Sequence, residues 1–243
     1  DYTELLEPLA TSCSAKLLPL PIGCTTKLNS EEAADAASAM CGTVNQNTGS
    51  LIIYTSGTTG RPKGVLHTRG SVAAQAASLS MAWEWQAGDR ILHTLPLHHI
   101  HGLVNALQCA HAAGAAVEFA SFSALHVWER FQSGEVTVFM GVPTMYSILL
   151  AKYGKMSAEQ QSAAGEAAQR LRLTISGSAA CPLVVMEQWD ALSGQRLLER
   201  YGMTEIGMAL SNLYKGERRP GFVGLPLPGV EVKMVRAGEG GDD

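Results

Sequence analysis

Short hydrophobic runs alternate with longer helical patterns along most of this chain. The runs predict strands at Leu51–Tyr54, Arg90–Leu95, Ala115–Phe119, Val136–Val142, Leu171–Ser176 and Arg196–Glu199. Helices are expected between them at residues 71–83, 102–113, 123–132, 143–153, 157–170 and 182–192. Strands and helices that alternate in this way predict an α/β fold, with largely parallel β-sheets covered by helices.

Serines and prolines mark where several of these helices should begin. Ser123 and Ser157 suit N-cap positions, and Gln160 can complete a capping box with Ser157. Pro143 and Pro182 suit the first helical position, where no backbone N–H is needed. These signals agree with the helix starts predicted from the hydrophobic spacing.

The pattern divides the chain into three parts. Residues 1–48 are weakly patterned, residues 49–235 carry the regular alternation, and residues 236–243 are a Gly-rich acidic tail. The segment Gly229–Val235 alternates by two and predicts a half-exposed strand, which would begin a smaller β subdomain. Because the chain starts without a methionine and stops soon after this strand, we interpret it as a fragment.

Composition and charge exclude several classes of protein. The 243 residues are 46% hydrophobic and 16% charged, which is typical of a globular protein and not of a disordered one. A net charge of -4 gives no global attraction to nucleic acid, and no run of about 20 apolar residues exists to span a bilayer. The five cysteines contain no C-x-x-C pair, which argues for reduced thiols in an intracellular protein.

The segment Y-T-S-G-T-T-G-R-P-K-G, residues 54–64, has the composition of a polyphosphate-binding loop. Its glycines let the backbone approach an anion, its hydroxyls can donate to phosphate oxygens, and its lysine supplies a positive charge. The candidate phosphate ligands are Thr55, Ser56, Gly57, Thr58, Thr59, Gly60 and Lys63. It is not a Walker A loop, because no glycine is followed five positions later by Gly-Lys. The alternative interpretation is a flexible surface loop.

Two further motifs carry candidate chemistry. In E-R-Y-G-M-T-E, residues 199–205, Glu205 is a candidate Mg²⁺ ligand, because Mg²⁺ prefers a carboxylate together with substrate phosphate oxygens. The alternative for Glu205 is an ion pair with a surface arginine. L-P-L-H-H-I-H-G, residues 95–102, holds three histidines in four positions, which leaves zinc as an alternative. No cysteine or carboxylate is spaced to complete a tetrahedral site, so zinc is the weaker interpretation.

At these motifs the chain resembles the adenylate-forming enzymes, the superfamily of acyl-CoA synthetases, luciferases and peptide-synthetase adenylation domains. The resemblance implies that residues 49–235 are the AMP-binding core of a large N-terminal domain, without the small C-terminal domain. It implies ATP and Mg²⁺ as cofactors and coenzyme A as co-substrate. It also implies that Tyr201 stacks on adenine, Thr204 contacts phosphate and Glu205 holds Mg²⁺.

S-G-S-A-A, residues 176–180, resembles the family's adenine and acyl-pocket segment. The resemblance implies adenine contacts for Ser178, Ala179, Ala180, Tyr201 and Gly202. It implies acyl-pocket positions for His99, Ser176, Gly177 and Met203. In the family the position of His99 lies beside the reacting carboxylate, so we choose His99 as catalytic and expect His98 in the core. We expect Cys181 to be buried filler and not a nucleophile.

Membership of this superfamily would not determine which acid is activated, so the residues expected near the acyl pocket have to indicate it. Residues 95–107 contain no acidic residue to bind an ammonium group, which argues against amino acids. Arg172 stands on the strand that enters S-G-S-A-A, and its guanidinium suits a second carboxylate. The alternative is that Arg172 belongs to a solvated strand edge.

The chain resembles malonyl-CoA synthetases, a mitochondrial member among them, in the sequences of several segments, including V-F-M-G-V-P-T-M-Y and L-L-E-R-Y-G-M-T-E-I-G. The resemblance implies activation of malonate or methylmalonate in the mitochondrial matrix or cytoplasm, with Arg172 binding the distal carboxylate. The alternatives are a short- or medium-chain fatty acyl-CoA synthetase and a non-catalytic nucleotide-binding domain. The family's ribose-binding Asp and adenylation Lys belong to segments beyond Asp243, so we expect this chain alone to be incomplete as an enzyme.

Overall fold

The computed structural model describes residues 45–56 and 61–236. In this part of the chain, β1 (Gly49–Thr55) and β2 (Lys63–Thr68) form a two-stranded antiparallel sheet with Thr55 opposite Lys63. The Gly/Thr-rich segment therefore joins two strands, and the predicted passage from strand through loop directly to helix is wrong. The sequence analysis did not predict β2, because K-G-V-L-H-T has few apolar residues and directly follows a Gly/Thr-rich segment that is typical of a loop.

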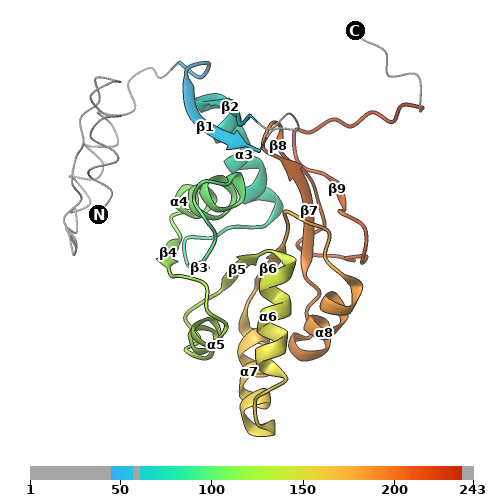
Figure 1. The fold of residues 1–243 in the computed structure, drawn as a ribbon. Helices are drawn as coiled ribbons and strands as arrows, with labels where there is room; N and C mark the ends of the chain where they lie inside the picture. The colour runs from blue at the N-terminus through green and yellow to red at the C-terminus, as the bar shows by residue number, and fades with distance from the viewer. Residues whose placement is uncertain (1–44, 57–60, 237–243) are drawn as a thin grey trace, which may run out of the picture. The chain divides into compact units, whose positions relative to one another are not determined.

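A seven-stranded sheet has the order β4-β3-β5-β6-β7-β8-β9 (Figure 1). Its parallel strands are β3 (Arg90–His93), β4 (Ala116–Phe119), β5 (Val138–Gly141), β6 (Leu173–Ser176) and β7 (Leu198–Met203). The antiparallel strands are β8 (Gly207–Ser211) and β9 (Leu225–Pro226). The predicted α/β fold with a largely parallel sheet is confirmed.

The helices form two groups. In one group α5 (Ala124–Gln132), α6 (Pro143–Tyr153), α7 (Ala158–Arg170) and α8 (Leu183–Ser193) pack on one another. In the other, α3 (Arg69–Ala82) packs on η1 (His101–Gln108) and α4 (Cys109–Ala112). The helix predicted at 102–113 is thus split, because its first two turns are wider π-helix. None of the helices described is long and apolar enough to cross a membrane.

The predicted helix starts hold in three of four cases. Ser157 and Gln160 form the expected capping box, and Pro143 is the first residue of α6. Ser123 occupies the N-cap of α5, but its side chain makes no capping hydrogen bond. Pro182 is the N-cap of α8 and not its first helical residue.

The strand predicted at Gly229–Val235 is wrong. Residues 230–236 have no regular structure, and the pairing to β8 is made instead by the two residues of β9. Val232 and Met234 are exposed, so the alternation of residue types finds no sheet edge to pair with in the described part of the chain.

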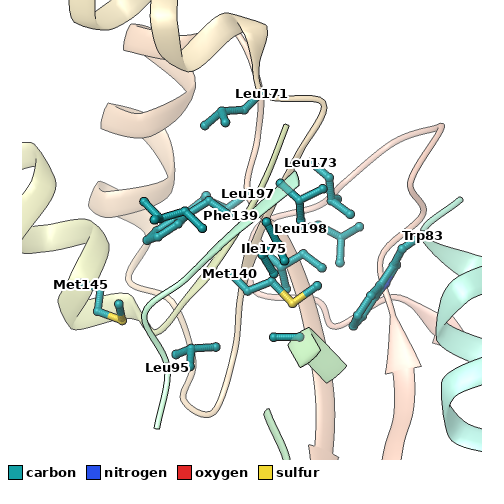
Figure 2. Packing of buried hydrophobic residues seen from close by; sticks show 14 of the residues in the cluster. Trp83, Leu95, Phe139, Met140, Met145, Leu171, Leu173, Ile175, Leu197 and Leu198 are labelled. Carbon is teal, nitrogen blue, oxygen red and sulfur yellow. The ribbon is translucent and has the colours of Figure 1, made fainter. Parts of the chain in front are cut away.

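The core lies around the central strands (Figure 2). Every residue of β5 and β6 is buried, as expected for parallel strands covered on both faces. The ring of Tyr146 on α6 meets that of Trp189 edge-on at 5.0 Å, and its hydroxyl donates to the carbonyl of Ile175 at 2.9 Å. This contact fixes α6 beside the end of β6, where the candidate site begins.

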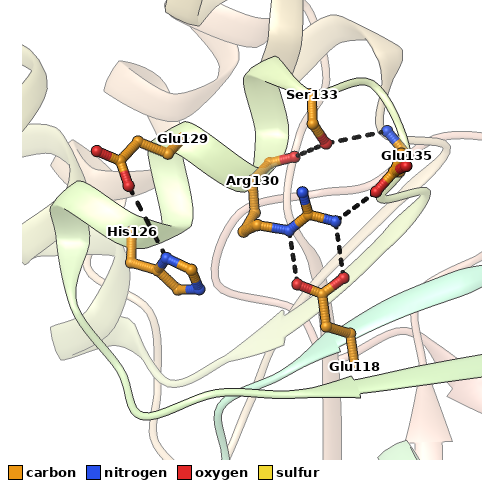
Figure 3. Close-up of polar contacts among 6 residues, drawn as sticks. All are labelled: Glu118, His126, Glu129, Arg130, Ser133 and Glu135. Carbon is orange, nitrogen blue, oxygen red and sulfur yellow. Dashed lines mark hydrogen bonds and ion pairs between the residues drawn. The ribbon is translucent and has the colours of Figure 1, made fainter.

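An ion-pair cluster joins the edge strand β4 to α5 (Figure 3). Arg130 donates to both carboxylate oxygens of Glu118, at 2.6 and 2.8 Å, and to Glu135 at 2.6 Å. The hydrogen bond from Arg130 holds the pKa of Glu135 below its usual range. These bonds tie the edge strand to the neighbouring helix, so we interpret the cluster as structural.

We expect Tyr146→Phe to lower the free energy of unfolding by about 1–2 kcal/mol, because it leaves the buried Ile175 carbonyl without this donor. Urea unfolding of the full-length protein, followed by tryptophan fluorescence, measures the change. Tyr153→Phe is the control, since no described residue accepts a hydrogen bond from Tyr153. An equal loss in both variants would contradict the assignment.

Candidate functional site

The C-terminal ends of the parallel strands surround a cavity of about 540 Å³, a size suited to a small-molecule ligand. Pro96 and His99 follow β3, Val142 follows β5, and Ser178 follows β6. Thr55 adds the end of β1. Ligands of open α/β sheets bind at this edge, because loops from neighbouring strands converge there.

The structure brings four of the predicted motifs together at this cavity. Seven of the predicted site residues line it: Thr55, His99, Ser178, Gly202, Met203, Thr204 and Glu205. These residues are up to 150 positions apart in the sequence. The strand order β3-β5-β6-β7 brings all of them together except Thr55, which comes from β1 of the two-stranded sheet. The predicted phosphate ligands Gly57, Thr58, Thr59 and Gly60 lie outside the described residues.

Other predicted residues do not line the cavity. Ser56, Lys63, Ala179, Ala180 and Tyr201 are exposed, whereas Ser176 and Gly177 are buried. Their predicted contacts with nucleotide or acid stay predictions.

Glu205 and the histidines bear on metal binding. Glu205 is exposed at the cavity and makes no ion pair with any described residue. A search of the described residues finds no group of three His, Cys, Asp or Glu side chains that could hold a metal ion. A cation at Glu205 would therefore need oxygens from a substrate, and the zinc interpretation has no support there. His98 is exposed beside His99, with ring centroids 4.3 Å apart, so its predicted core position is wrong.

Arg172 does not face the acyl pocket, and this prediction is wrong. Arg172 precedes the first residue of β6, whereas the cavity lies beyond its last residue, Ser176. Its Nε donates to Asp89 at 2.6 Å, its Nη2 donates to the second Asp89 oxygen, and its Nη1 donates to the Trp83 carbonyl at 3.1 Å. The guanidinium also lies 5.3 Å from the ring centre of Tyr214. Arg172 is not a solvated edge residue but half of a partly buried ion pair, and it does not line this cavity.

Arg200, which the sequence analysis missed, occupies the cavity instead. It lies on β7 with only 5% of its surface exposed, and its Nε and Nη2 have no hydrogen-bond partner among the described residues. Burial lowers the pKa of its guanidinium to about 10, which leaves it charged at neutral pH. A side chain at Gly177 would collide with this guanidinium, so the glycine makes room for it.

Glu199 does not neutralise Arg200, because neighbouring strand residues point to opposite faces. The Glu199 carboxylate accepts from the backbone N–H of Cys181 at 3.0 Å, and no ion pair joins it to Arg200. Cys181 is buried, as expected for filler. Two adjacent charged residues in a strand whose neighbours are apolar were the signal that could have identified Arg200.

His101 is the second missed residue. It lines the cavity at the first position of η1, is 3% exposed, and its Nδ1 lies 3.2 Å from the Ser178 hydroxyl. Burial, followed by the charges of Arg200 and His93, holds the pKa of His101 well below its usual value, so the ring is neutral.

Comparison with known proteins identifies the family. The family model described as AMP-binding enzyme matches residues 10–242. The chain belongs to the AMP-binding enzyme family. The mitochondrial malonate–CoA ligase of Bos taurus is 47% identical over 243 residues, which are 97% of this chain and 41% of that protein. The malonate–CoA ligase of Arabidopsis thaliana is 50% identical over 195 residues, 76% of this chain and 32% of that protein.

Solved structures of the family agree with the fold. A malonyl-CoA ligase with methylmalonyl-CoA and AMP bound gives a TM-score of 0.73 at 37% identity, over 78% of this chain and 40% of that one. ATP-bound MatB from Rhodopseudomonas palustris gives 0.74 at 32% identity, over 94% and 44%. The chain spans about two fifths of the length of the curated relatives that it matches over nearly its whole length.

The ion pair of Arg172 predicts a stability effect and not a substrate effect. Burial alone would raise the pKa of Asp89, but hydrogen bonds from Arg172 and from the Gln86 N–H outweigh it and lower the pKa below its usual value. The pair therefore stabilises the fold fully when the pH is above the usual pKa of an aspartate. This stabilisation is lost as the pH falls through the lowered pKa of Asp89. We expect Arg172→Ala to lower the free energy of unfolding at pH 7 by about 3 kcal/mol.

Denaturant unfolding of the full-length protein between pH 7 and pH 3 tests this, and the difference from the wild type should shrink at the acid end. Per folded molecule, kcat/KM for each acid should stay unchanged. A selective loss of dicarboxylate activation would contradict our placement of Arg172.

Proposed function

We propose that the protein containing this chain is an ATP-dependent acid–CoA ligase that activates malonate or methylmalonate. In the first step, a carboxylate oxygen of the acid attacks the α-phosphorus of ATP, which forms an acyl-adenylate and releases pyrophosphate. In the second step, the sulfur of coenzyme A attacks the acyl carbonyl carbon and AMP leaves. The names of the relatives and the product bound in the structural neighbour support this reaction class.

The observation that carries the choice of acid is the guanidinium of Arg200, which has no ion-pair partner among the described residues. A buried charge without a partner is costly, and an anionic ligand group at the cavity would compensate it. Malonate has two carboxylates joined by one carbon. One of them can pair with Arg200 while the other is left to react with ATP.

Arg200 would also reject monocarboxylic acids. An alkyl chain beside it would displace water and leave the guanidinium unpaired, so we expect kcat/KM for malonate to exceed that for a monocarboxylic acid by a factor of about a hundred or more. His99, which lines the same cavity, would lie beside the reacting carboxylate, with Met203 on the wall of the acyl pocket.

The nucleotide would occupy the other part of the cavity. Thr55, Thr204 and the loop at residues 56–63 would donate to phosphate oxygens, and Tyr201 and Gly202 with residues 178–180 would border the adenine. Glu205 fits Mg²⁺ that is shared with ATP, because its carboxylate is accessible and has no ion-pair partner among the described residues. When bound, Mg²⁺ would neutralise charge on the phosphates.

The compartment is part of the proposal. Because the Bos taurus relative is named as mitochondrial, we propose the mitochondrial matrix, with the cytoplasm as the alternative. Imaging of the tagged full-length protein distinguishes the two.

We expect Arg200→Gln to reduce kcat/KM for malonate about a hundredfold or more, because the distal carboxylate loses its charged partner. ATP–pyrophosphate exchange by the full-length protein with malonate and with butyrate measures the effect, and butyrate activity should not fall. Arg170→Gln is the matched control, since Arg170 is exposed at the end of α7. Exchange driven only by monocarboxylates in the wild type would refute the malonate assignment, and no exchange with any acid would favour a non-catalytic nucleotide-binding domain.

For Glu205→Gln, we expect the Mg²⁺ concentration at half-maximal exchange to rise about tenfold, because a neutral amide is a poorer Mg²⁺ ligand. The KM for malonate should not change. Glu187→Gln, on the exposed side of α8, is the control. An unchanged Mg²⁺ dependence would show that Glu205 is not the ligand.

A further inference from the structure

Glu205 lies on a short turn that joins β7 to β8. Met203 pairs with Gly207 in the antiparallel register, so residues 204–206 form the turn. Gly207 ends it with a backbone φ of +69°, a left-handed conformation that favours glycine. Glu205 is exposed, and an accessible turn is among the least rigid parts of a fold unless its base is held.

The side chain of Gln75, on α3, holds the base of this turn. Its Nε2 donates to the carbonyl of Met208 at 3.4 Å, and its Oε1 accepts from the backbone N–H of the same residue. A Cβ at Gly207 would collide with this oxygen, so the glycine lets the amide approach the strand closely. Among the described residues, no other side chain makes a hydrogen bond to residues 203–208. Gln75 therefore provides the side-chain link between α3 and the turn.

Gln75 takes the place of a neighbouring strand at Met208. In the described part of the chain, β9 pairs with β8 at Leu210 and Ser211, which leaves Met208 beyond its reach. Met208 is buried, and buried backbone groups need hydrogen-bond partners. A glutamine amide offers one acceptor and donors, as a peptide group would. Loss of this amide would leave both backbone groups of Met208 without their partner and release the start of β8.

The helix gives Gln75 a fixed origin. A capping box closes the start of α3. At its other end, the indole N–H of Trp83 donates to the Ser211 hydroxyl at 3.0 Å. Between them, the Ser78 hydroxyl donates to the Pro228 carbonyl at 2.9 Å. The helix is thus tied to the antiparallel part of the sheet at several points, and the point nearest the turn is Gln75.

A carboxylate that binds Mg²⁺ needs such a support. Mg²⁺ demands a nearly octahedral arrangement of oxygens at short distances, so a small displacement of one ligand weakens binding. Groups that do not touch the metal tune its affinity when they fix the orientation of a ligand. Gln75 does not line the cavity of about 540 Å³, so its influence on the site would pass through the backbone at the base of the turn.

We propose that Gln75 is a positioning residue that holds Glu205 in the orientation for Mg²⁺ shared with ATP, through the backbone of Met208. This inference rests on the proposed function, because that function makes Glu205 the Mg²⁺ ligand.

The test measures the Mg²⁺ concentration at half-maximal ATP–pyrophosphate exchange with malonate, in the full-length protein with Gln75→Met, Glu205→Gln or both. Methionine keeps the unbranched shape and the helix propensity of glutamine but cannot bond to the backbone of Met208. We expect Gln75→Met to raise this concentration about fivefold, because the carboxylate is displaced but not removed. The KM for malonate should not change, and kcat should recover at saturating Mg²⁺.

The double variant shows whether Gln75 acts through Glu205. Once the Glu205 carboxylate is gone, Gln75→Met should add no further rise in the Mg²⁺ requirement. A rise of the same size in both backgrounds would mean that Gln75 supports the fold in general, and would overturn the proposal. Gln75→Asn, one methylene too short to reach both backbone groups, should behave as Gln75→Met does, and it decides the matter should the methionine variant not fold.

Ser78→Ala is the matched control, because it removes another hydrogen bond from α3 to the backbone, away from the turn. Its Mg²⁺ dependence should equal that of the wild type, and a rise equal to that of Gln75→Met would contradict the role of Gln75. Glu205→Gln separates the two claims. If it leaves the Mg²⁺ dependence unchanged, the proposed metal ligand fails and the role of Gln75 with it, whereas a shift there beside an unchanged Gln75→Met overturns only the role of Gln75.

Discussion

The positive charge of Arg200, buried within β7 without a counter-ion among the described residues, is the constraint on which the chemistry of the cavity depends. The neighbouring Glu199 is committed to the backbone of Cys181, and the backbone of Gly177 occupies the space beside the guanidinium. Keeping a charge in such a place costs stability unless something compensates it. The fold thus holds a cation where a small anionic ligand can enter, and that asymmetry gives the cavity its chemical character.

The parallel sheet explains why this cation meets the other site residues. Strands β3, β5, β6 and β7 are neighbours that run in one direction, so the segments that follow them gather at one edge. Burial of every residue in β5 and β6, and the bond from Tyr146 to the end of β6, fix that edge. The residues that we propose to bind phosphate, acid and metal can therefore come from motifs that are far apart in sequence.

Hydrophobic spacing and turn residues predicted most of the fold from Arg90 onward, because each of those elements has its own apolar pattern and a clear boundary. The antiparallel strand β2 was missed, since its exposed residues resemble a loop. The strand predicted at Gly229–Val235 is absent for the opposite reason. Apolar and polar residues alternate there, but whether a neighbouring strand is available for pairing depends on the tertiary structure.

Residue type alone pointed to Thr55 and Glu205, and the family resemblance pointed to Thr204; all three line the cavity. The arginine at the cavity needed the structure, because Arg172 directly precedes β6 and Arg200 lies in β7, and both strands lead to the site. Arg172, directly before β6, pairs with Asp89, 83 positions away, whereas Arg200 lies at the cavity and pairs with no carboxylate in the part of the chain that the structure describes. Such long-range pairing leaves no trace in the local sequence, and neither does the contact of His101 with Ser178.

The most direct measurement is a crystal structure of the full-length protein with malonate and a non-hydrolysable ATP analogue. The account predicts that one carboxylate of malonate lies within hydrogen-bond distance of the Arg200 guanidinium, about 2.7–2.9 Å, while the other faces the α-phosphate. A malonate whose carboxylates both lie away from Arg200, or an Arg200 paired with another residue of the protein, would contradict it.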